Sequence, residues 1–172
     1  LPLVFALTRA EARFDVPVDT TNGYVTYTFL GGGCGLNEQD APWGAYPYID
    51  IREFYRWNVS CVSTNGGYAS TGWPATGAIS QSKYMAFQMI PQPGYAFRVR
   101  PGTLGFKVRG DDSGPDSLAV VIQVAYQPLH TLMTTSVTTE LRSVSGGPVE
   151  DIEISSPALV RFHAWRSDSV AG

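Results

Sequence analysis

The chain has 172 residues, which is enough for one domain that buries a core without several disulfides or a metal to hold it. Charged residues make up only 16% of it, whereas 18 glycines, 12 prolines and an aromatic share of 12% are typical of turn-rich all-β proteins. The net charge of −3 and the scattered lysines and arginines exclude a basic surface for a phosphate backbone, so we expect no nucleic acid as a partner.

The N-terminal segment, residues 1–12, is apolar and ends in Ala10-Glu11-Ala12, a pattern that resembles the end of a secretory signal peptide. It is too short to cross a bilayer, so we expect no transmembrane span of its own. Two interpretations stay open: a first strand within its own sheet, or a docking segment that adds a strand to a partner protein. The side chains that would dock are Leu1, Leu3, Phe5 and Leu7.

Residues 13–172 are expected to form the sandwich domain, and they begin with a hairpin. Asn22-Gly23 lies between alternating residues and is a strong turn signal, which predicts a second strand over residues 24–30. The glycine-rich run at 31–35 lacks the Gly-Lys-Ser/Thr ending of a phosphate-binding loop, and no amphipathic helix follows it. A tight or flexible loop is therefore expected there.

The stretch 37–48 is irregular and rich in aromatic residues and proline. Its rings would stack on sugars or on a protein partner if they were exposed, whereas burial, the commoner outcome, would hold the loop to the sandwich. The candidate binding residues, from this loop and from positions further along, are Trp43, Tyr46, Tyr48, Trp57 and Trp73.

Residues 49–62 alternate and predict a strand with a bulge near Arg52-Glu53, whereas the Gly/Ser/Thr-rich residues 63–82 predict a long loop. Cys34 and Cys61 lie on either side of the aromatic loop. In an exported protein they would form one disulfide, and two buried thiols are the alternative. A zinc site is not expected, because there is no CxxC spacing and no pair of histidines beside them.

The central stretch, residues 84–126, carries the strongest strand pattern. Large apolar side chains alternate with polar ones over residues 95–99 and again over 104–109, which predicts two strands with one solvent-exposed face. Residues 118–126 are almost continuous in valine, isoleucine and alanine, which predicts a strand in the middle of a sheet.

The turn that follows residue 109 contains Asp111, Asp112 and Asp116, whose carboxylates are ligands of the kind that Ca²⁺ prefers. Their spacing lacks the bidentate glutamate and the regular alternation of an EF-hand loop. The neighbouring Gly114-Pro115 favours a plain turn.

The remaining strands are expected at 132–141, 149–154 and 158–165, with a turn at 145–148, acidic outward residues on an edge strand at 149–154, and the last strand closing the sheet. In all, about nine or ten strands and no long amphipathic helix are expected. The sequence therefore predicts an all-β, jelly-roll-like antiparallel β-sandwich in a single domain.

Motifs in the middle third of the chain resemble a known family. They are Tyr84-x-x-Phe87, Pro93-Gly94-Tyr95, Leu104-x-Phe106-x-Val108-Arg109, Ser113-Gly114-Pro115 and Leu118-Ala119-Val120. Their order resembles that in secreted bacterial β-sandwich domains of proteins sorted by the PEP-CTERM/exosortase route, with a weaker continuation at Val160-Arg161-Phe162. The resemblance implies a jelly-roll-like sandwich, export to the periplasm or cell surface, and no catalytic residues. The chain departs from the family at its end, DSVAG, which has no Pro-Glu-Pro tripeptide, membrane helix or basic tail.

Catalytic machinery is not expected. The two histidines, His130 and His163, fall in a loop and on a strand, no Gly-x-Ser-x-Gly motif is present, and no pair of carboxylates is distinguished by its surroundings. We therefore expect no enzyme and no cofactor apart from the weak calcium candidate. The leading hypothesis is an exported structural or accessory subunit that docks on a larger surface or membrane-associated assembly through protein partners. A carbohydrate-binding module is the first alternative, and a Ca²⁺-dependent adhesion domain is the second.

Overall fold

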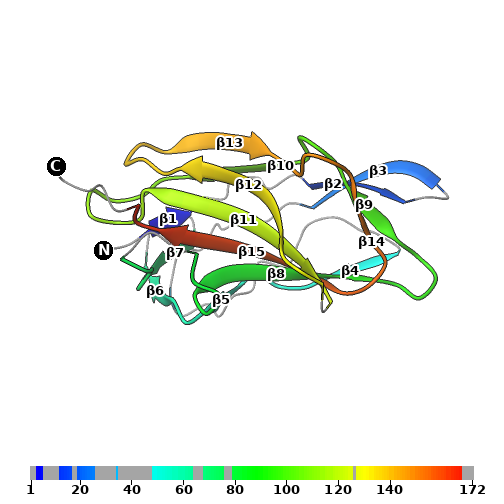
Figure 1. Ribbon diagram of the computed structural model, residues 1–172, viewed down its shortest axis with the longest axis horizontal. Coiled ribbons are helices and arrows are strands. Elements are labelled where there is room, and N and C mark those ends of the chain that lie inside the picture. Colours follow the sequence, from blue (N-terminus) through cyan, green and yellow to red (C-terminus); the bar gives the residue numbers. More distant parts are fainter. Residues whose placement is uncertain are drawn as a thin grey trace.

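The computed structural model describes residues 3–5, 12–16, 19–25, 34, 48–63, 68–75, 79–125 and 127–167. The regular elements in these ranges are fifteen β-strands, and every strand pairing is antiparallel (Figure 1). Within the same ranges there is no helix of the length and hydropathy that a membrane span requires. The predicted all-β, jelly-roll-like antiparallel sandwich is confirmed.

One layer of the sandwich is a six-stranded sheet that runs across Figure 1. In spatial order its strands are β12 (His130–Ser136), β11 (Ser117–Val124), β15 (Ala158–Trp165), β8 (Tyr84–Pro91) and, both on the far side of β8, β4 (Ile49–Ile51) and β5 (Tyr55–Trp57).

The opposing strands fall into three smaller sheets. The four-stranded sheet has the order β14 (Ile152–Ile154), β9 (Phe97–Val99), β2 (Ala12–Val16) and β3 (Asp19–Val25). The other two are the pair β10 (Leu104–Val108) and β13 (Arg142–Gly146), and the three-stranded sheet β1 (Leu3–Phe5), β7 (Tyr68–Thr71) and β6 (Ser60–Val62).

The core lies between the six-stranded sheet and these smaller sheets. Phe162 of β15 joins the two sides, because its ring meets Phe106 of β10 edge-on at 5.6 Å and Phe54 at 5.4 Å. All three rings are buried, and burial of a phenylalanine side chain stabilises the fold by about 2 kcal/mol. β11 is buried on both faces over five successive residues, as predicted for a strand in the middle of a sheet.

The predicted hairpin exists, but its turn lies elsewhere. Asn22 and Gly23 are inside β3, where Gly23 pairs with Phe14 of β2. The register closes at Val16 and Asp19, so the connection falls at residues 17–18, which the structure does not describe. In the sequence a proline follows Val16, and proline is a turn former like Asn-Gly, so the local pattern contains two candidate turns. Of the second strand predicted over 24–30, only the part up to Val25 lies within the described residues.

Further predictions about strands were wrong in detail. Residues 49–62 form three short strands, because the chain leaves β8 after β4, returns to it as β5, and then turns at Asn58 (φ 52°) into β6 of another sheet. Residues 63–82 were expected to be loop but contain β7, which lies between β1 and β6. The last strand has the predicted bounds, yet β15 lies in the middle of its sheet between β11 and β8.

Candidate functional site

The outer face of the six-stranded sheet, which is turned away from the core, carries the candidate site. On β8, the core side chains are those of Met85, Phe87 and Met89. Because successive strand residues point to opposite faces, Tyr84 and Ala86 belong to the outer face. The neighbouring strands follow the same alternation.

Strand register brings outer-face side chains from four strands together. Trp57 of β5 is paired with Tyr84 of β8, and Tyr55 is paired with Ala86. Ala86 in turn is paired with Arg161 of β15, which is also paired with a residue of β11. We call the resulting group the outer-face cluster, and its members are Tyr55, Trp57, Tyr84, Gln123 and Arg161.

Trp57 is the exposed ring of the outer-face cluster. Its side chain is 51% exposed, although it lies on a strand and not on a loop. Its ring is nearly parallel to the buried ring of Tyr84, at 12° and with 6.2 Å between centroids. The indole is therefore held on a rigid support and still presents a large surface to a ligand.

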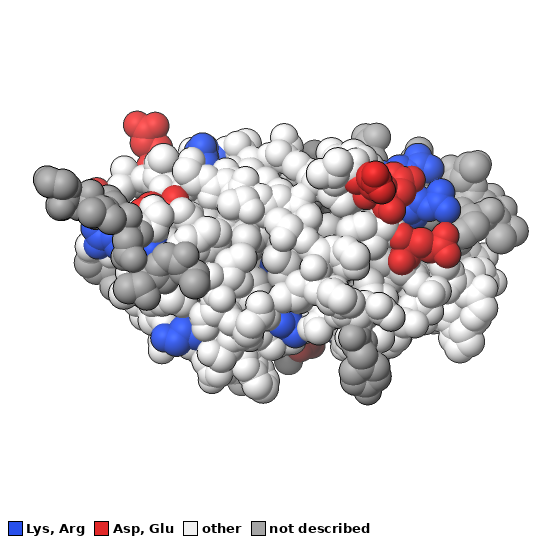
Figure 2. All heavy atoms as spheres, viewed as in Figure 1, with Lys and Arg blue, Asp and Glu red and all other residues white. Residues whose placement is uncertain are grey.

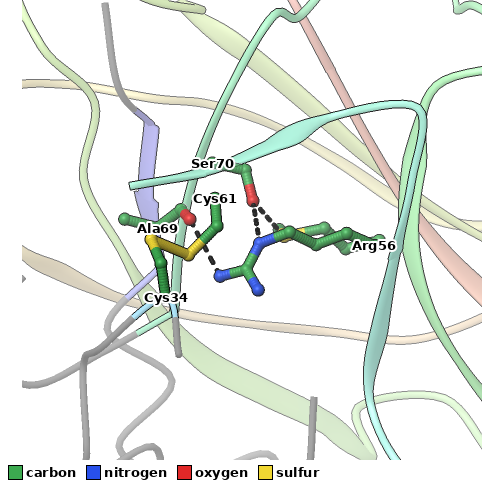
Figure 3. The surroundings of a disulfide bond; sticks show 6 residues. Cys34, Arg56, Cys61, Ala69 and Ser70 are labelled. Carbon is green, nitrogen blue, oxygen red and sulfur yellow. Dashed lines mark hydrogen bonds between the residues drawn. A yellow bond between two sulfur atoms is a disulfide. The ribbon is translucent and has the colours of Figure 1, made fainter. Parts of the chain in front are cut away.

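β5 is anchored from its other face by Arg56 (Figure 3). The guanidinium group donates hydrogen bonds to Ser70 Oγ (2.8 Å) and to the carbonyl oxygen of Ala69 (2.9 Å) in β7. It also lies 3.5 Å from the centroid of the Tyr68 ring. The alternation of β5 then leaves Tyr55 and Trp57 facing outward, while the arginine between them ties the strand to the three-stranded sheet.

Arg161 supplies the positive charge of the outer-face cluster. Its guanidinium carbon lies 4.7 Å from the centroid of the Tyr84 ring, and Nη2 donates a hydrogen bond to Gln123 Oε1. The side chain is partly buried, and its Nε has no hydrogen-bond partner in the described part of the chain. Burial raises the pKa of Tyr55, Tyr84 adds to this shift and the charge of Arg161 opposes it, so the Tyr55 hydroxyl keeps its proton at neutral pH.

His163 lies on the same face but is only 1% exposed, so it supports the site instead of facing solvent. Its Nδ1 lies 3.0 Å from the carbonyl oxygen of Ser80 and 3.2 Å from that of Lys83, which requires Nδ1 to carry the proton and donate. Burial lowers the pKa of the imidazole, against the effect of these two carbonyls. The ring therefore holds residues 80–83 against β15, next to Tyr84 at 5.6 Å.

Of the predicted binding residues, the structure places only Trp57 in the cluster. Tyr48 stacks on Tyr95 at 4.2 Å, at the opposite end of β8, and Trp43 and Tyr46 lie outside the described residues. The prediction of Trp73 as a binding residue was wrong, because Trp73 is only 9% exposed and its indole N–H donates a hydrogen bond to the carbonyl oxygen of Ser70. A ring packed in the core has no free face for a sugar.

The predicted docking segment is part of the sandwich where it is described. Leu3 and Phe5 belong to β1, which pairs with β7 of the same chain through Ser70 and Tyr68. Leu1 and Leu7 lie outside the described residues.

The three aspartates of the calcium hypothesis do not form a metal-binding group, and neither do other acids, histidines or cysteines in the described ranges. Asp116 instead accepts hydrogen bonds from the backbone N–H and the Oγ of Ser167, each at 2.7 Å, and from Ser117 Oγ. Burial acts to raise the pKa of Asp116, but these hydrogen bonds outweigh it and lower the pKa. Gly114 N–H donates to the carbonyl oxygen of Asp111, as in a plain turn.

Cys34 and Cys61 form a disulfide, with their Cα atoms 5.6 Å apart (Figure 3). The bridge joins the turn at Cys34 to β6, the strand that follows β5 in the chain. Sequence reasoning expected this pairing for an exported protein.

Four members of the cluster were not predicted, namely Tyr55, Tyr84, Gln123 and Arg161. Arg161 and Tyr84 appear in the sequence inside apolar strands, where their alternation with core residues is the signal that assigns them to the outer face. The pairing of β5 with β8, which brings them to Trp57, has no such signal.

Charged side chains are unevenly distributed over the face shown in Figure 2. Arg98 of β9 forms ion pairs with Asp151 (3.8 Å) and with Glu153 of β14 (3.2 Å). Figure 2 shows charged side chains gathered at the end of the molecule where these strands lie, whereas the middle of the visible face carries few. Lysine and arginine are not gathered into a basic patch on that face.

No protein-family model and no curated protein matches the chain. Its fold is similar to that of a solved structure, a mutant of a carbohydrate binding module family 29, with 14% sequence identity and a TM-score of 0.31. The match covers 83% of this chain and 94% of that one. At this TM-score the similarity carries no argument about function.

Proposed function

We propose that the chain is a non-catalytic carbohydrate-binding module, and that its ligand lies on the outer-face cluster. The observation that supports this function is the exposure of Trp57 on a strand of the large sheet, backed by Tyr84. An indole presented in this way is suited to stack on the apolar face of a sugar ring.

The polar members of the cluster complete the proposed site. A sugar hydroxyl group needs donors and acceptors in fixed positions beside the stacking ring. The Tyr55 hydroxyl, the Gln123 amide and the Arg161 guanidinium provide them within the same face, and the last two are hydrogen-bonded to each other. Because all of them lie on strands, their geometry is preorganised.

The test is binding of the purified chain to a panel of soluble polysaccharides, measured by affinity electrophoresis and calorimetry. We expect Trp57→Ala to weaken binding to any retained polysaccharide by about tenfold or more, because the stacking surface is removed. Leu141→Ala is the matched control, since Leu141 is also exposed (46%) but follows β12 on the loop to β13. Unchanged affinity of the folded Trp57→Ala protein would refute the proposed site.

The disulfide supports a location outside the reducing cytoplasm, in the periplasm or at the cell surface, because structural disulfides persist in oxidising compartments. Export also agrees with what the resemblance to PEP-CTERM/exosortase-sorted domains implies.

A second candidate is a structural or accessory subunit of a larger assembly. The observation that favours it is the position of β1 at the edge of its sheet among the described strands, because a partner protein could add a strand at such an edge. A chain that no polysaccharide retains, but that sediments with a protein partner, would favour this second candidate.

A further inference from the structure

Arg161 carries a charge that nothing in the described structure balances. Ion pairs in the described ranges involve Arg52 with Asp50 and Arg98 with two acids of the edge region, and none involves Arg161. Its described partners are the neutral amide of Gln123 and the ring of Tyr84. A partly buried cation with only neutral partners has lost water without gaining an anion.

The acid of the neighbouring strand β4 does not supply this anion. Asp50, the acid on the outer side of β4, is engaged with Arg52 at 2.8 Å. On β8, Asp50 is paired with Ile90 and Arg161 is paired with Ala86. These two positions are four residues apart, which corresponds to roughly 13 Å along the strand. An acid at that distance, already paired, does not neutralise the guanidinium group.

The guanidinium group is also held in place before any ligand binds. Gln123 accepts a hydrogen bond from one nitrogen, and the central carbon of the guanidinium group lies within cation–π distance of the Tyr84 ring. A planar guanidinium group fixed in this way is suited to receive a carboxylate or sulfate group through paired hydrogen bonds.

We infer that the carbohydrate ligand is anionic, and that Arg161 binds a carboxylate or sulfate group on the sugar that stacks next to Trp57. This inference rests on the proposed function and adds the class of ligand to it. It differs from a general attraction of polyanions, because the chain as a whole has a net charge of −3.

The experiment compares polymers that share a backbone and differ in charge. Polygalacturonate is compared with its fully methyl-esterified form, and dextran sulfate with dextran, by calorimetry at low salt. We expect tighter binding to at least one charged polymer than to its neutral counterpart, by about tenfold or more, as for one charge-assisted hydrogen-bonded pair. The pair that shows the difference identifies a carboxylate or a sulfate as the group.

Arg161→Gln should abolish this difference, whereas Arg109→Gln, which removes an exposed arginine at the end of β10, should leave it unchanged. Arg161→Lys should keep part of the preference, because the charge remains and the paired hydrogen bonds are lost. If Arg161→Gln does not fold, the wild-type protein serves as the test. Its preference for the charged polymer must fall as the salt concentration rises, while its affinity for the neutral polymer must stay the same.

The outcomes separate the two proposals. If the protein bound charged and neutral polymers equally well and Trp57→Ala bound neither, the carbohydrate-binding function would stand. The inference that the ligand is anionic would then be overturned. A preference for the charged polymer that survives in Arg161→Gln would overturn the role of Arg161. Binding to neither charged polymer would overturn the inference as a whole.

Discussion

At the scale of single residues, the buried imidazole of His163 makes the stability of the fold depend on pH. Its pKa is lowered in the folded protein, so the unfolded chain takes up the proton first, below about pH 6.5. Stability is therefore full above that pH and falls as the pH decreases toward the folded-state pKa. The slope cannot exceed about 1.4 kcal/mol per pH unit, the limit for one proton.

Urea unfolding at a series of pH values between roughly 5 and 8 measures this dependence. His163→Asn, which keeps an N–H group near the position of Nδ1 but does not titrate, should flatten the curve in this range. His130→Gln, which replaces the exposed histidine at the start of β12, is the control and should leave the slope as it is. A wild-type protein whose stability increases on acidification would contradict the assigned protonation state.

The fate of two tryptophans shows what the sequence could predict of the site and what it could not. Trp57 and Trp73 were equal candidates, but one is exposed and the other lies in the core. A strand usually turns its apolar side chains toward the core and its charged ones toward solvent. In β5 the reverse holds, because Arg56 faces inward and Trp57 outward. The inward arginine is stabilised by Ser70 and Ala69 of a strand 13 and 14 residues further along, which no local pattern reveals.

At the scale of elements, the turn between β13 and β14 packs against the turn between β9 and β10 at Gly147. A Cβ atom at this position would lie 2.7 Å from the backbone nitrogen of Gly102 and 2.8 Å from the carbonyl oxygen of Arg100. We expect Gly147→Ala to lower the free energy of unfolding by about 1 to 3 kcal/mol, because one of the two turns must move. Gly105→Ala is the control in chemical denaturation, since its Cβ would meet the carbonyl oxygen of Val144 at 3.9 Å, an ordinary contact. Equal stability of the two variants would show that the turns adjust freely.

Strands whose own sequence alternates between apolar and polar residues were predicted. Strands that form because distant segments pair with them were not. β9, β10 and β11 follow from their own apolar pattern, which matches their burial. β7 has only four residues in a stretch of glycine, serine and threonine, and it is a strand because β1 and β6 pair with it on both sides. Pairings of this kind override local propensity.

At the scale of the whole molecule, the disulfide between Cys34 and Cys61 restricts the unfolded chain. It spans a sequence separation of 27, for which loop-closure entropy corresponds to about 3.5 kcal/mol of stability. The free energy of unfolding of the Cys34→Ser/Cys61→Ser double variant should be lower by about that amount, so the variant should unfold at a lower denaturant concentration. A reducing agent should bring the wild type to the same midpoint. The double variant itself should not respond to the reducing agent, and an equal midpoint for all samples would show that the bridge adds nothing.

The class of the fold was predictable from composition and periodicity, whereas the order of strands was not. Turn-rich composition and two-residue alternation suffice for an antiparallel sandwich. The position of each strand depends instead on contacts between residues far apart in the chain, and the assembly of Trp57, Arg161 and Gln123 on one face depends on that order.

The insertion of β15 between β8 and β11 constrains when the protein can fold. Both neighbours are synthesised well before residues 158–165, so each must wait with an unsatisfied backbone edge until that last segment has left the ribosome. Completion of the large sheet is therefore a late and slow event, because β15 must pair with β8, a strand far earlier in the chain. A nascent chain stalled before this step would be prone to associate with other chains.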